Sequence, residues 1–265
     1  MIMNDLHDYI LRVDGLDVHL RMGGQGGPDT VLLHGIPGSG ATWDAVLSRL
    51  SAEGRVIVPD LVGFGGSSRT SDFDDLHADG QARRLEAALR SVGVERAVLV
   101  GHDFGGPVAV RLLMRAPDIC AGLMLASTNV FTDTPIPFPL SLVNAPLIGG
   151  AVSRMLFSRA ALRGMCRFGA KQGRVDTFMA VNDRAQSAAI RQIFAGSLTR
   201  LSELYAPIEE AIRACSVPVL VAWGDRDPFF PEAQATRTAD AIPGASLRML
   251  RGCGHFLPDE APDLL

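Results

Sequence analysis

The sequence predicts an α/β fold in which helices cover one mostly parallel sheet. Short apolar runs alternate along the chain with longer segments of helical periodicity, a pattern typical of strands joined by crossover helices. Glycine-containing polar motifs follow several of the apolar runs, at the carboxyl ends of the expected strands, where open α/β sheets bind ligands. The 265 residues are enough for one large core with a smaller inserted unit.

Eight strands are expected in this sheet. The first two, at 8–13 and 16–22, would pair as a hairpin around Asp14-Gly15. Six parallel strands would follow, at 31–33, 56–58, 97–100, 123–126, 217–223 and 246–250. Helical periodicity lies between them, at 41–50, 76–92, 105–115 and 232–240.

One interval breaks this alternation. About ninety residues separate the strand that ends near Ala126 from the strand that begins at Val217, far more than a crossover needs. This interval has helical periodicity and no strong strand signal. We therefore expect a helical cap at 131–214, inserted into an α/β core made of 1–130 and 215–265.

Composition narrows the class of protein. Hydrophobic residues make up 47% and charged residues 20%, as in a globular chain, and the net charge of −4 offers no reason to expect nucleic acid. The amino terminus lacks a signal-peptide pattern, and prolines and glycine interrupt the longest apolar region, 135–152. The four scattered cysteines fit neither a zinc site nor a disulfide scaffold. We expect a soluble cytoplasmic protein with buried reduced thiols, no metal or other cofactor, and no membrane partner.

The stretch Val98–Val110 carries the strongest chemical signal. An apolar strand runs into Gly-His-Asp-Phe-Gly and then into a helix, which predicts a sharp turn that presents Asp103 where serine hydrolases present serine. A carboxylate that attacks an ester carbonyl forms a reactive anhydride, and this intermediate gives little catalytic advantage. Attack on an sp3 carbon displaces a leaving group and leaves an ordinary ester. Asp103 therefore favours opening an epoxide or expelling a halide.

Four further motifs each follow an expected strand, and their order is informative. They are His34–Pro37 (His-Gly-Ile-Pro), Asp60–Ser67 (Asp-Leu-Val-Gly-Phe-Gly-Gly-Ser), Trp223–Pro228 (Trp-Gly-Asp-Arg-Asp-Pro) and Gly252–Phe256 (Gly-Cys-Gly-His-Phe). Together with Asp103 they resemble the α/β-hydrolases of the epoxide hydrolase and haloalkane dehalogenase group over nearly the whole chain. The resemblance implies the α/β-hydrolase fold with an inserted helical cap. Members usually continue into a final helix, so the ten residues after the last histidine suggest a shortened or unusual ending.

The resemblance also implies a catalytic triad. Asp103 would be the nucleophile, His255 the base that activates water, and Asp227 the acid that orients the imidazole. Asp225 is the alternative acid, but the group places its acid at the second Asp, directly before proline. Asp60 is expected to accept hydrogen bonds that stabilise its own loop.

The backbone N–H groups of Ile36 and Phe104 would form the oxyanion hole of this group. His34 and Pro37 are candidate substrate contacts, although His34 is also suited to fixing its loop by hydrogen bonding. His102 is expected to point away from the nucleophile and to pack in the core.

The groups that assist departure of a leaving group are few. Epoxide hydrolases of this group use two cap tyrosines, whereas this chain has only Tyr9 and Tyr205. Tyr205 is the candidate acid, with an ordinary half-buried aromatic as the alternative. Dehalogenases use side-chain N–H donors, which Phe104 and Ile36 do not offer. Asn129 is a candidate substitute donor or a turn residue.

These observations rank three functions. Epoxide hydrolysis leads, haloalkane dehalogenation is the alternative, and a serine-hydrolase-like scaffold altered for ligand binding or a non-hydrolytic reaction is the third. In the first two cases the substrate is expected to be a small and largely apolar molecule.

The expected cap is basic. Residues 151–200 carry a net charge of +7, from Arg154, Arg159, Arg163, Arg167, Lys171, Arg174, Arg184, Arg191 and Arg200 against Asp176 and Asp183. Four of these cations recur every fourth residue from Arg159 and so share one helical face. That face is either a solvated surface or a site for an acidic substrate or for the acidic body of a second subunit in a homodimer.

Overall fold

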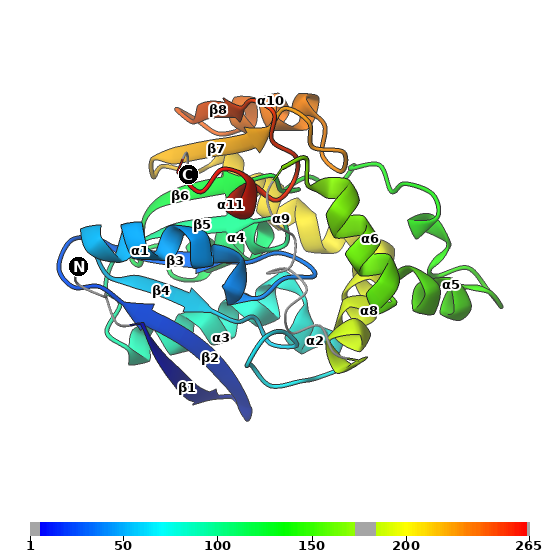
Figure 1. Ribbon diagram of the computed structural model, residues 1–265, viewed down its shortest axis with the longest axis horizontal. Coiled ribbons are helices and arrows are strands. Elements are labelled where there is room, and N and C mark those ends of the chain that lie inside the picture. The colour runs from blue at the N-terminus through cyan, green and yellow to red at the C-terminus, as the bar shows by residue number, and fades with distance from the viewer. Residues whose placement is uncertain (1–5, 173–183, 264–265) are drawn as a thin grey trace.

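The computed structural model describes residues 6–172 and 184–263 (Figure 1). Its single sheet has eight strands in the order β1-β2-β4-β3-β5-β6-β7-β8. The strands are β1 (His7–Val13), β2 (Leu16–Gly23), β3 (Asp29–Leu33), β4 (Val56–Pro59), β5 (Ala97–His102), β6 (Cys120–Ala126), β7 (Val219–Gly224) and β8 (Ser246–Leu250). The β1–β2 and β2–β4 pairs are antiparallel and the other pairs are parallel. The predicted eight-stranded, mostly parallel sheet is confirmed.

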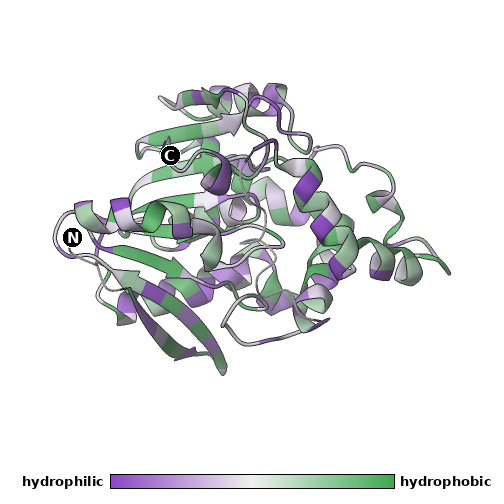
Figure 2. Ribbon diagram, in the orientation of Figure 1, coloured by the Kyte–Doolittle hydropathy of each residue, from purple (hydrophilic) through white to green (hydrophobic). Residues whose placement is uncertain are grey.

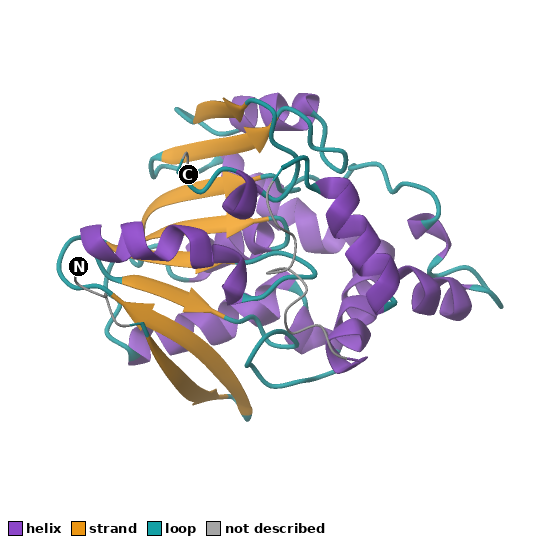
Figure 3. Ribbon diagram, viewed as in Figure 1, coloured by secondary structure: helices purple, strands orange, loops and turns teal. Residues whose placement is uncertain are grey.

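Helices cover both faces of the sheet (Figure 3). Those outside the interval between β6 and β7 are η1 (Gly40–Trp43), α1 (Asp44–Glu53), α2 (Phe73–Leu76), α3 (Ala78–Ser91), α4 (Gly105–Arg115), α10 (Glu232–Ala241) and α11 (Leu257–Glu260). One buried cluster contains Trp43, Leu47 and Leu257 from η1, α1 and α11, and the other contains Leu85 and Val108 from α3 and α4. Because both faces are covered, the central strands are almost continuously hydrophobic, whereas polar residues interrupt β1 and β2 (Figure 2).

Several element boundaries differ from the sequence-based expectation, and three of them show how local chemistry sets a boundary. The helix expected at 76–92 is two helices, because His77 is extended (ψ 165°) and its Nδ1 accepts the N–H of Asp79 at 3.2 Å, which caps α3. The helix expected from residue 41 begins as the 3-10 helix η1. The strand expected from Val217 begins at Val219, after Pro218, which has no N–H for a ladder hydrogen bond.

The interval between β6 and β7 contains helices and no strand in the residues that the structure describes. These are η2 (Leu140–Leu142), α5 (Gly149–Leu156), α6 (Arg159–Gly169), α8 (Arg184–Thr199) and α9 (Leu201–Arg213), and α5, α6 and α8 lie beyond the arrowheads of the strands (Figure 1). Helix α9 packs on α4, and α8 packs on α2. Arg174, Asp176 and Asp183 of the expected basic set lie outside the described residues.

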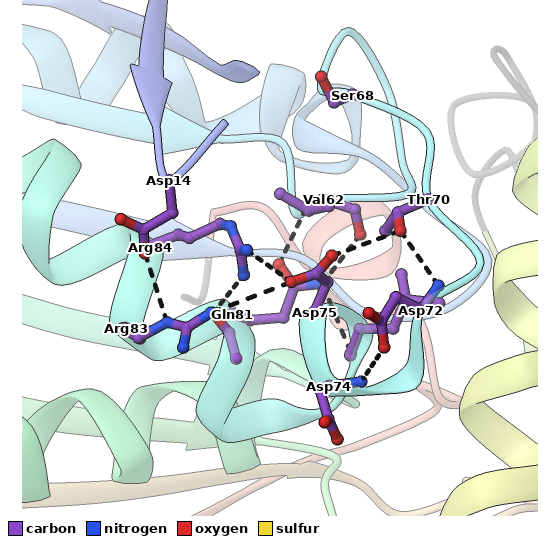
Figure 4. A network of polar contacts seen from close by, with 12 residues as sticks. Asp14, Val62, Ser68, Thr70, Asp72, Asp74, Asp75, Gln81, Arg83 and Arg84 are labelled. Atoms are coloured by element: carbon purple, nitrogen blue, oxygen red, sulfur yellow. Dashed lines mark hydrogen bonds and ion pairs between the residues drawn. The ribbon is translucent and has the colours of Figure 1, made fainter. Parts of the chain in front are cut away.

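A polar network fixes the loop that follows β4 (Figure 4). The side-chain amide of Gln81 accepts the N–H of Val62 at 2.9 Å and donates to the carbonyl of the same residue at 2.8 Å. In the same loop, Asp60 accepts the N–H groups of Gly40 at 2.6 Å and Gly66 at 2.7 Å. As expected, Asp60 stabilises its loop, and it also joins that loop to the start of η1.

Two further features of the described residues concern the cysteines and the helices. All four cysteines are free thiols with buried side chains. Within residues 6–172 and 184–263, every helix is too short or too polar to cross a bilayer.

Candidate active site

Asp103 occupies a strained turn between β5 and α4. Its φ is +50°, a left-handed conformation that non-glycine residues seldom adopt. The neighbouring backbone is so close that a Cβ at Gly101 would lie 2.4 Å from the carbonyl oxygen of Gly105, and one at Gly106 would lie 2.2 Å from Oγ1 of Thr128. The Thr128 hydroxyl donates to the Asp103 carbonyl at 2.5 Å. The glycines of the motif are therefore needed for the close packing that holds Asp103 out of the sheet.

Three of the sequence-predicted residues come together at the carboxyl end of the sheet. His255 Nε2 lies 3.5 Å from Asp103 Oδ1, and His255 Nδ1 lies 2.9 Å from Asp227 Oδ2. The other oxygen of Asp227 accepts the N–H groups of Phe229 at 2.8 Å and Phe230 at 3.0 Å. Because every oxygen of Asp227 has a partner, its orientation relative to the imidazole is fixed.

The alternative acid lies elsewhere in the same loop. Asp225 Oδ1 accepts the N–H of Gly252 at 2.7 Å in an exposed position, whereas the imidazole of His255 bonds to Asp227. The structure thus brings Asp227, and not Asp225, to His255. His102 is fully buried, and its Nε2 donates to the backbone carbonyl of His255 at 2.8 Å. It supports the backbone of His255, consistent with the expected packing position.

The loop after β3 supplies an N–H group to the nucleophile. Ile36 N donates to Asp103 Oδ2 at 2.8 Å, and a Cβ at Gly35 would lie 2.4 Å from the Cβ of Asp103, so this loop touches the carboxylate. His34 Nδ1 donates to the Gly35 carbonyl at 2.9 Å, and its Nε2 accepts the N–H of Leu61 at 3.0 Å. His34 is fully buried with both nitrogens bonded to backbone, so it fixes the loop and has no nitrogen to offer a substrate.

Pro37, a predicted substrate contact, and Phe104, a predicted donor of the oxyanion hole, have different structural roles. The carbonyl of Pro37 accepts the side-chain amide of Gln186, a buried residue of α8, at 2.8 Å. This bond joins the helical interval to the Ile36 loop, and the sequence contains no local pattern that predicts it. Phe104 stands at the start of α4, where the helix dipole favours negative charge on the adjacent Asp103.

A small pocket of about 10 Å³, with room for about one water molecule, lies beside Phe104. It is lined by His77, Ala78, Asp79, Phe104, Arg111, Ser197, Leu204, Tyr205 and Ile208. Burial, and then the charge of Asp103, raise the pKa of Tyr205, so its hydroxyl stays protonated near the nucleophile. Sequence reasoning assigned no function to His77 and did not single out Arg111, because α2, α3, α4 and α9 meet here only in the folded chain.

Asn129 holds the first turn after β6. Its amide nitrogen donates to the carbonyl of Phe131 at 3.0 Å, and its Oδ1 accepts the N–H of the same residue at 3.1 Å and the side-chain amide of Gln234 at 2.8 Å. This is the turn role that was the alternative to halide binding. The indole N–H of Trp223 donates to the carbonyl of Phe230 at 2.8 Å, so it too is engaged in the protein.

The electrostatics of the three central groups are coupled. Burial alone would lower the pKa of His255, but the charges and hydrogen bonds of Asp227 and Asp103 outweigh it and raise that pKa to about 10. Burial would raise the pKa of both aspartates, yet their contacts with His255 and with backbone N–H groups hold each pKa below its usual value. At neutral pH an imidazolium therefore lies between two carboxylates.

Comparison with known proteins places the fold in a family. Residues 31–262 match the model of the alpha/beta hydrolase fold. The chain is 30% identical to 2-hydroxymuconate semialdehyde hydrolase of Pseudomonas sp. (strain CF600) over 246 residues, which cover 91% of this chain and 85% of that protein. It is 27% identical to epoxide hydrolase 3 of Xenopus tropicalis over 285 residues, covering 97% and 74% of the two chains. It is also 27% identical to cis-3-alkyl-4-alkyloxetan-2-one decarboxylase of Shewanella oneidensis over 277 residues, covering 96% and 84%. The chain belongs to the α/β-hydrolase-fold family.

Proposed function

We propose that this protein hydrolyses epoxides to diols through an ester intermediate on Asp103. The observation that carries the proposal is a carboxylate on the turn after β5, with its Oδ1 3.5 Å from the imidazole of His255. A carboxylate nucleophile suits attack on an sp3 carbon, because the product is an ordinary ester that water can hydrolyse.

The two oxygens of Asp103 have different surroundings in the first step. Oδ2 accepts the N–H of Ile36 at 2.8 Å, which leaves Oδ1 as the attacking atom. Oδ1 forms a bond to an epoxide carbon while the ring C–O bond breaks and its electron pair goes to the ring oxygen. That oxygen needs a proton, and the proposed donor is Tyr205, which lines the pocket beside Phe104 and whose raised pKa keeps its hydroxyl protonated.

The second step uses His255 as a base. Ester formation removes the charge of Asp103, one of the two charges that raise the pKa of His255, so that pKa falls and the imidazole can pass its proton, through water, to the Tyr205 phenolate left by the first step. The neutral Nε2 then takes a proton from water, whose oxygen attacks the ester carbonyl carbon. Negative charge develops on the former Oδ2, where the Ile36 N–H already points and the Phe104 N–H is expected. Collapse of this intermediate breaks the bond to the substrate oxygen, which takes the proton of the newly formed Asp103 carboxyl group, so the diol leaves and the Asp103 carboxylate is regenerated.

The proposal is tested by trapping the ester. A His255→Ala variant incubated with a panel of epoxides should gain the mass of one epoxide, located on Asp103 by peptide mapping, because attack proceeds and hydrolysis stalls. Asp103→Asn is the control and should gain no mass. A single turnover of the native protein in H2(18)O should label Asp103 and not the diol. Failure of every epoxide to give an adduct would overturn the proposal and favour a ligand-binding scaffold.

Dehalogenation is the less supported alternative. Phe104 and Ile36 have apolar side chains, and the amide nitrogen of Asn129 and the indole of Trp223 donate to backbone carbonyls. None of these four described positions therefore offers a free side-chain N–H group to a departing halide. Release of bromide or chloride from a haloalkane panel would reverse this ranking.

A strained cyclic ester is a second candidate substrate class. The relative from Shewanella oneidensis is named for an oxetan-2-one, and opening that ring by attack of Asp103 on its sp3 carbon would release a carboxylate, which needs no proton donor. This matches a chain with only two tyrosines. Loss of CO2 from the intermediate, with expulsion of Asp103, would give an alkene without water or His255. A His255→Ala variant that still forms alkene from an oxetan-2-one would favour this reaction, whereas diol formation requires His255.

A further inference from the structure

Glu260 has an unusual set of partners for a side chain outside the triad. It closes the short helix α11, five residues after His255, and is 7% exposed. Its carboxylate accepts four backbone N–H groups. Oε2 accepts those of Lys171 at 2.8 Å, Gln172 at 3.1 Å and Gly254 at 2.8 Å, and Oε1 accepts that of Phe256 at 3.0 Å.

These donors lie in two segments that are far apart in the sequence. Gly254 and Phe256 flank His255, whereas Lys171 and Gln172 follow α6. Bonds between a carboxylate and N–H groups are among the stronger hydrogen bonds in proteins. Glu260 therefore links the backbone on both sides of His255 to the end of α6.

The backbone of His255 itself is held in the same way. Its N–H donates to the carbonyl of Gly169, the last residue of α6, at 3.0 Å, and its carbonyl accepts His102 Nε2 at 2.8 Å. A Cβ at Gly254 would lie 2.0 Å from the Gly169 carbonyl oxygen, so the two segments are in direct contact. The backbone around the imidazole is thus held against the end of α6, and Glu260 adds two hydrogen bonds to each of the two segments.

We propose that Glu260 is a positioning residue that holds the imidazole of His255 in register with Asp103 and Asp227 by clamping the flanking backbone to the end of α6. The inference rests on the proposed role of His255 as the base. The imidazole must serve two partners at once, Asp227 Oδ2 at 2.9 Å and Asp103 Oδ1 at 3.5 Å. A shift of the loop would misalign both contacts.

The two steps of the proposed reaction separate this role from general stabilisation. Attack by Asp103 on carbon does not use His255, whereas hydrolysis of the ester does. In Glu260→Gln the side-chain NH2, a donor, would face a backbone N–H, also a donor, so at least one of the four bonds is lost. Loss of positioning should therefore slow hydrolysis while leaving alkylation intact.

The kinetic experiment is rapid-quench intact-mass analysis with an epoxide that alkylates the native protein. In Glu260→Gln, ester hydrolysis should fall by about 10- to 100-fold, so that the adduct accumulates, while alkylation stays within about threefold of the native rate. Glu260→Asp keeps an acceptor-only carboxylate and should retain more of the hydrolysis rate. Glu95→Gln, an exposed carboxylate of the loop before β5, is the matched control and should change neither rate. Equal loss of both rates, or no loss of hydrolysis, would overturn the proposal.

A second measurement does not depend on turnover. Titration of the His255 imidazole nitrogens by NMR should give a midpoint in Glu260→Gln at least about one pH unit lower than in the native protein, because the ring moves away from the two carboxylates. An unchanged midpoint would overturn the positioning role. If Glu260→Gln does not fold, Glu260→Asp is titrated instead: its side chain is one methylene too short to keep all four bonds, so its midpoint should also fall, by less, and no fall would overturn the proposal. A native protein that forms no adduct, combined with a shifted midpoint, would overturn only the proposed function.

Discussion

Asp103 and His255 control each other's ionisation at the scale of single residues. Asp103 has Oδ1 toward the imidazole and Oδ2 toward the N–H of Ile36, and Asp227 faces the opposite side of the ring. A buried ring between two carboxylates holds its proton until one of the carboxylates is neutralised. The proposed ester performs that neutralisation, so the base becomes available only after the first step.

Replacement of Asp103 by Asn should reproduce this effect without substrate. One of the charges that raise the pKa of His255 to about 10 is removed, while Asp227 remains, so the pKa of His255 should fall. NMR titration of the imidazole measures the change. Asp225→Asn, which neutralises a carboxylate that bonds to Gly252 N, should leave the midpoint near the native value. A midpoint unchanged in Asp103→Asn would contradict the coupling.

At the scale of elements, the turn between β5 and α4 depends on close backbone packing. Gly106→Ala would place a Cβ 2.2 Å from Thr128 Oγ1, and Thr128 is bonded to the Asp103 carbonyl. We expect the free energy of unfolding to fall by about 1–3 kcal/mol, and adduct formation on Asp103 to slow. Urea unfolding and intact-mass kinetics measure the two effects.

Gly164→Ala is the matched control for that substitution. Gly164 lies inside α6, and a Cβ there would meet nothing within 4 Å. Alanine is the better helix former, so the free energy of unfolding should rise by about 0.5–1 kcal/mol. If both substitutions lowered the free energy of unfolding equally, close packing at Gly106 would not explain the effect of Gly106→Ala.

The exposed face of α6 carries arginines whose role can be tested by charge reversal. Arg163 and Arg167 are exposed, and among the described residues no ion pair is formed by either. If this face binds an acidic substrate or a second subunit, the double change Arg163→Glu and Arg167→Glu should weaken that binding at low salt. Arg248→Glu with Arg251→Glu, exposed cations at and after β8, is the control pair. Light scattering and substrate affinity that match the native protein would refute the interpretation.

At the scale of the whole molecule, the central imidazolium links stability to pH. The pKa of His255 in the folded state is raised from 6.5 to about 10, so its contribution to stability is complete below pH 6.5 and is lost as pH rises through about 10. The low pKa values of Asp103 and Asp227 act at the acid end, where falling pH removes their contribution. Stability from this site is therefore greatest in weakly acidic to neutral solution.

Urea unfolding of the native protein and of His255→Gln measures this contribution. The difference between their free energies of unfolding should shrink as pH rises from 6.5 toward 10, because the native imidazole loses its proton over that range whereas the glutamine amide does not titrate. A difference that stays constant over this range would contradict the assigned coupling.

Local sequence was sufficient for the sheet and for the residues at the ends of its strands. All eight strands follow from apolar runs, and the glycines around Asp103 indicate the turn that presents it. Local sequence did not predict the break at His77, because that boundary depends on a side chain that caps α3. Nor did it separate Asp227 from Asp225 by any local property, since both stand in the same short loop.

The sequence by itself therefore determined the fold class and the order of the candidate catalytic groups. Only the tertiary structure decided which groups meet. In the folded chain both ring nitrogens of His34 bond to backbone groups. His77 and Arg111 line the pocket beside Phe104, and Glu260 bonds to the backbone around His255. The physical reason is range: hydrophobic periodicity and turn chemistry act over a few residues, whereas hydrogen bonds and charge coupling in a buried site join segments that only folding brings together.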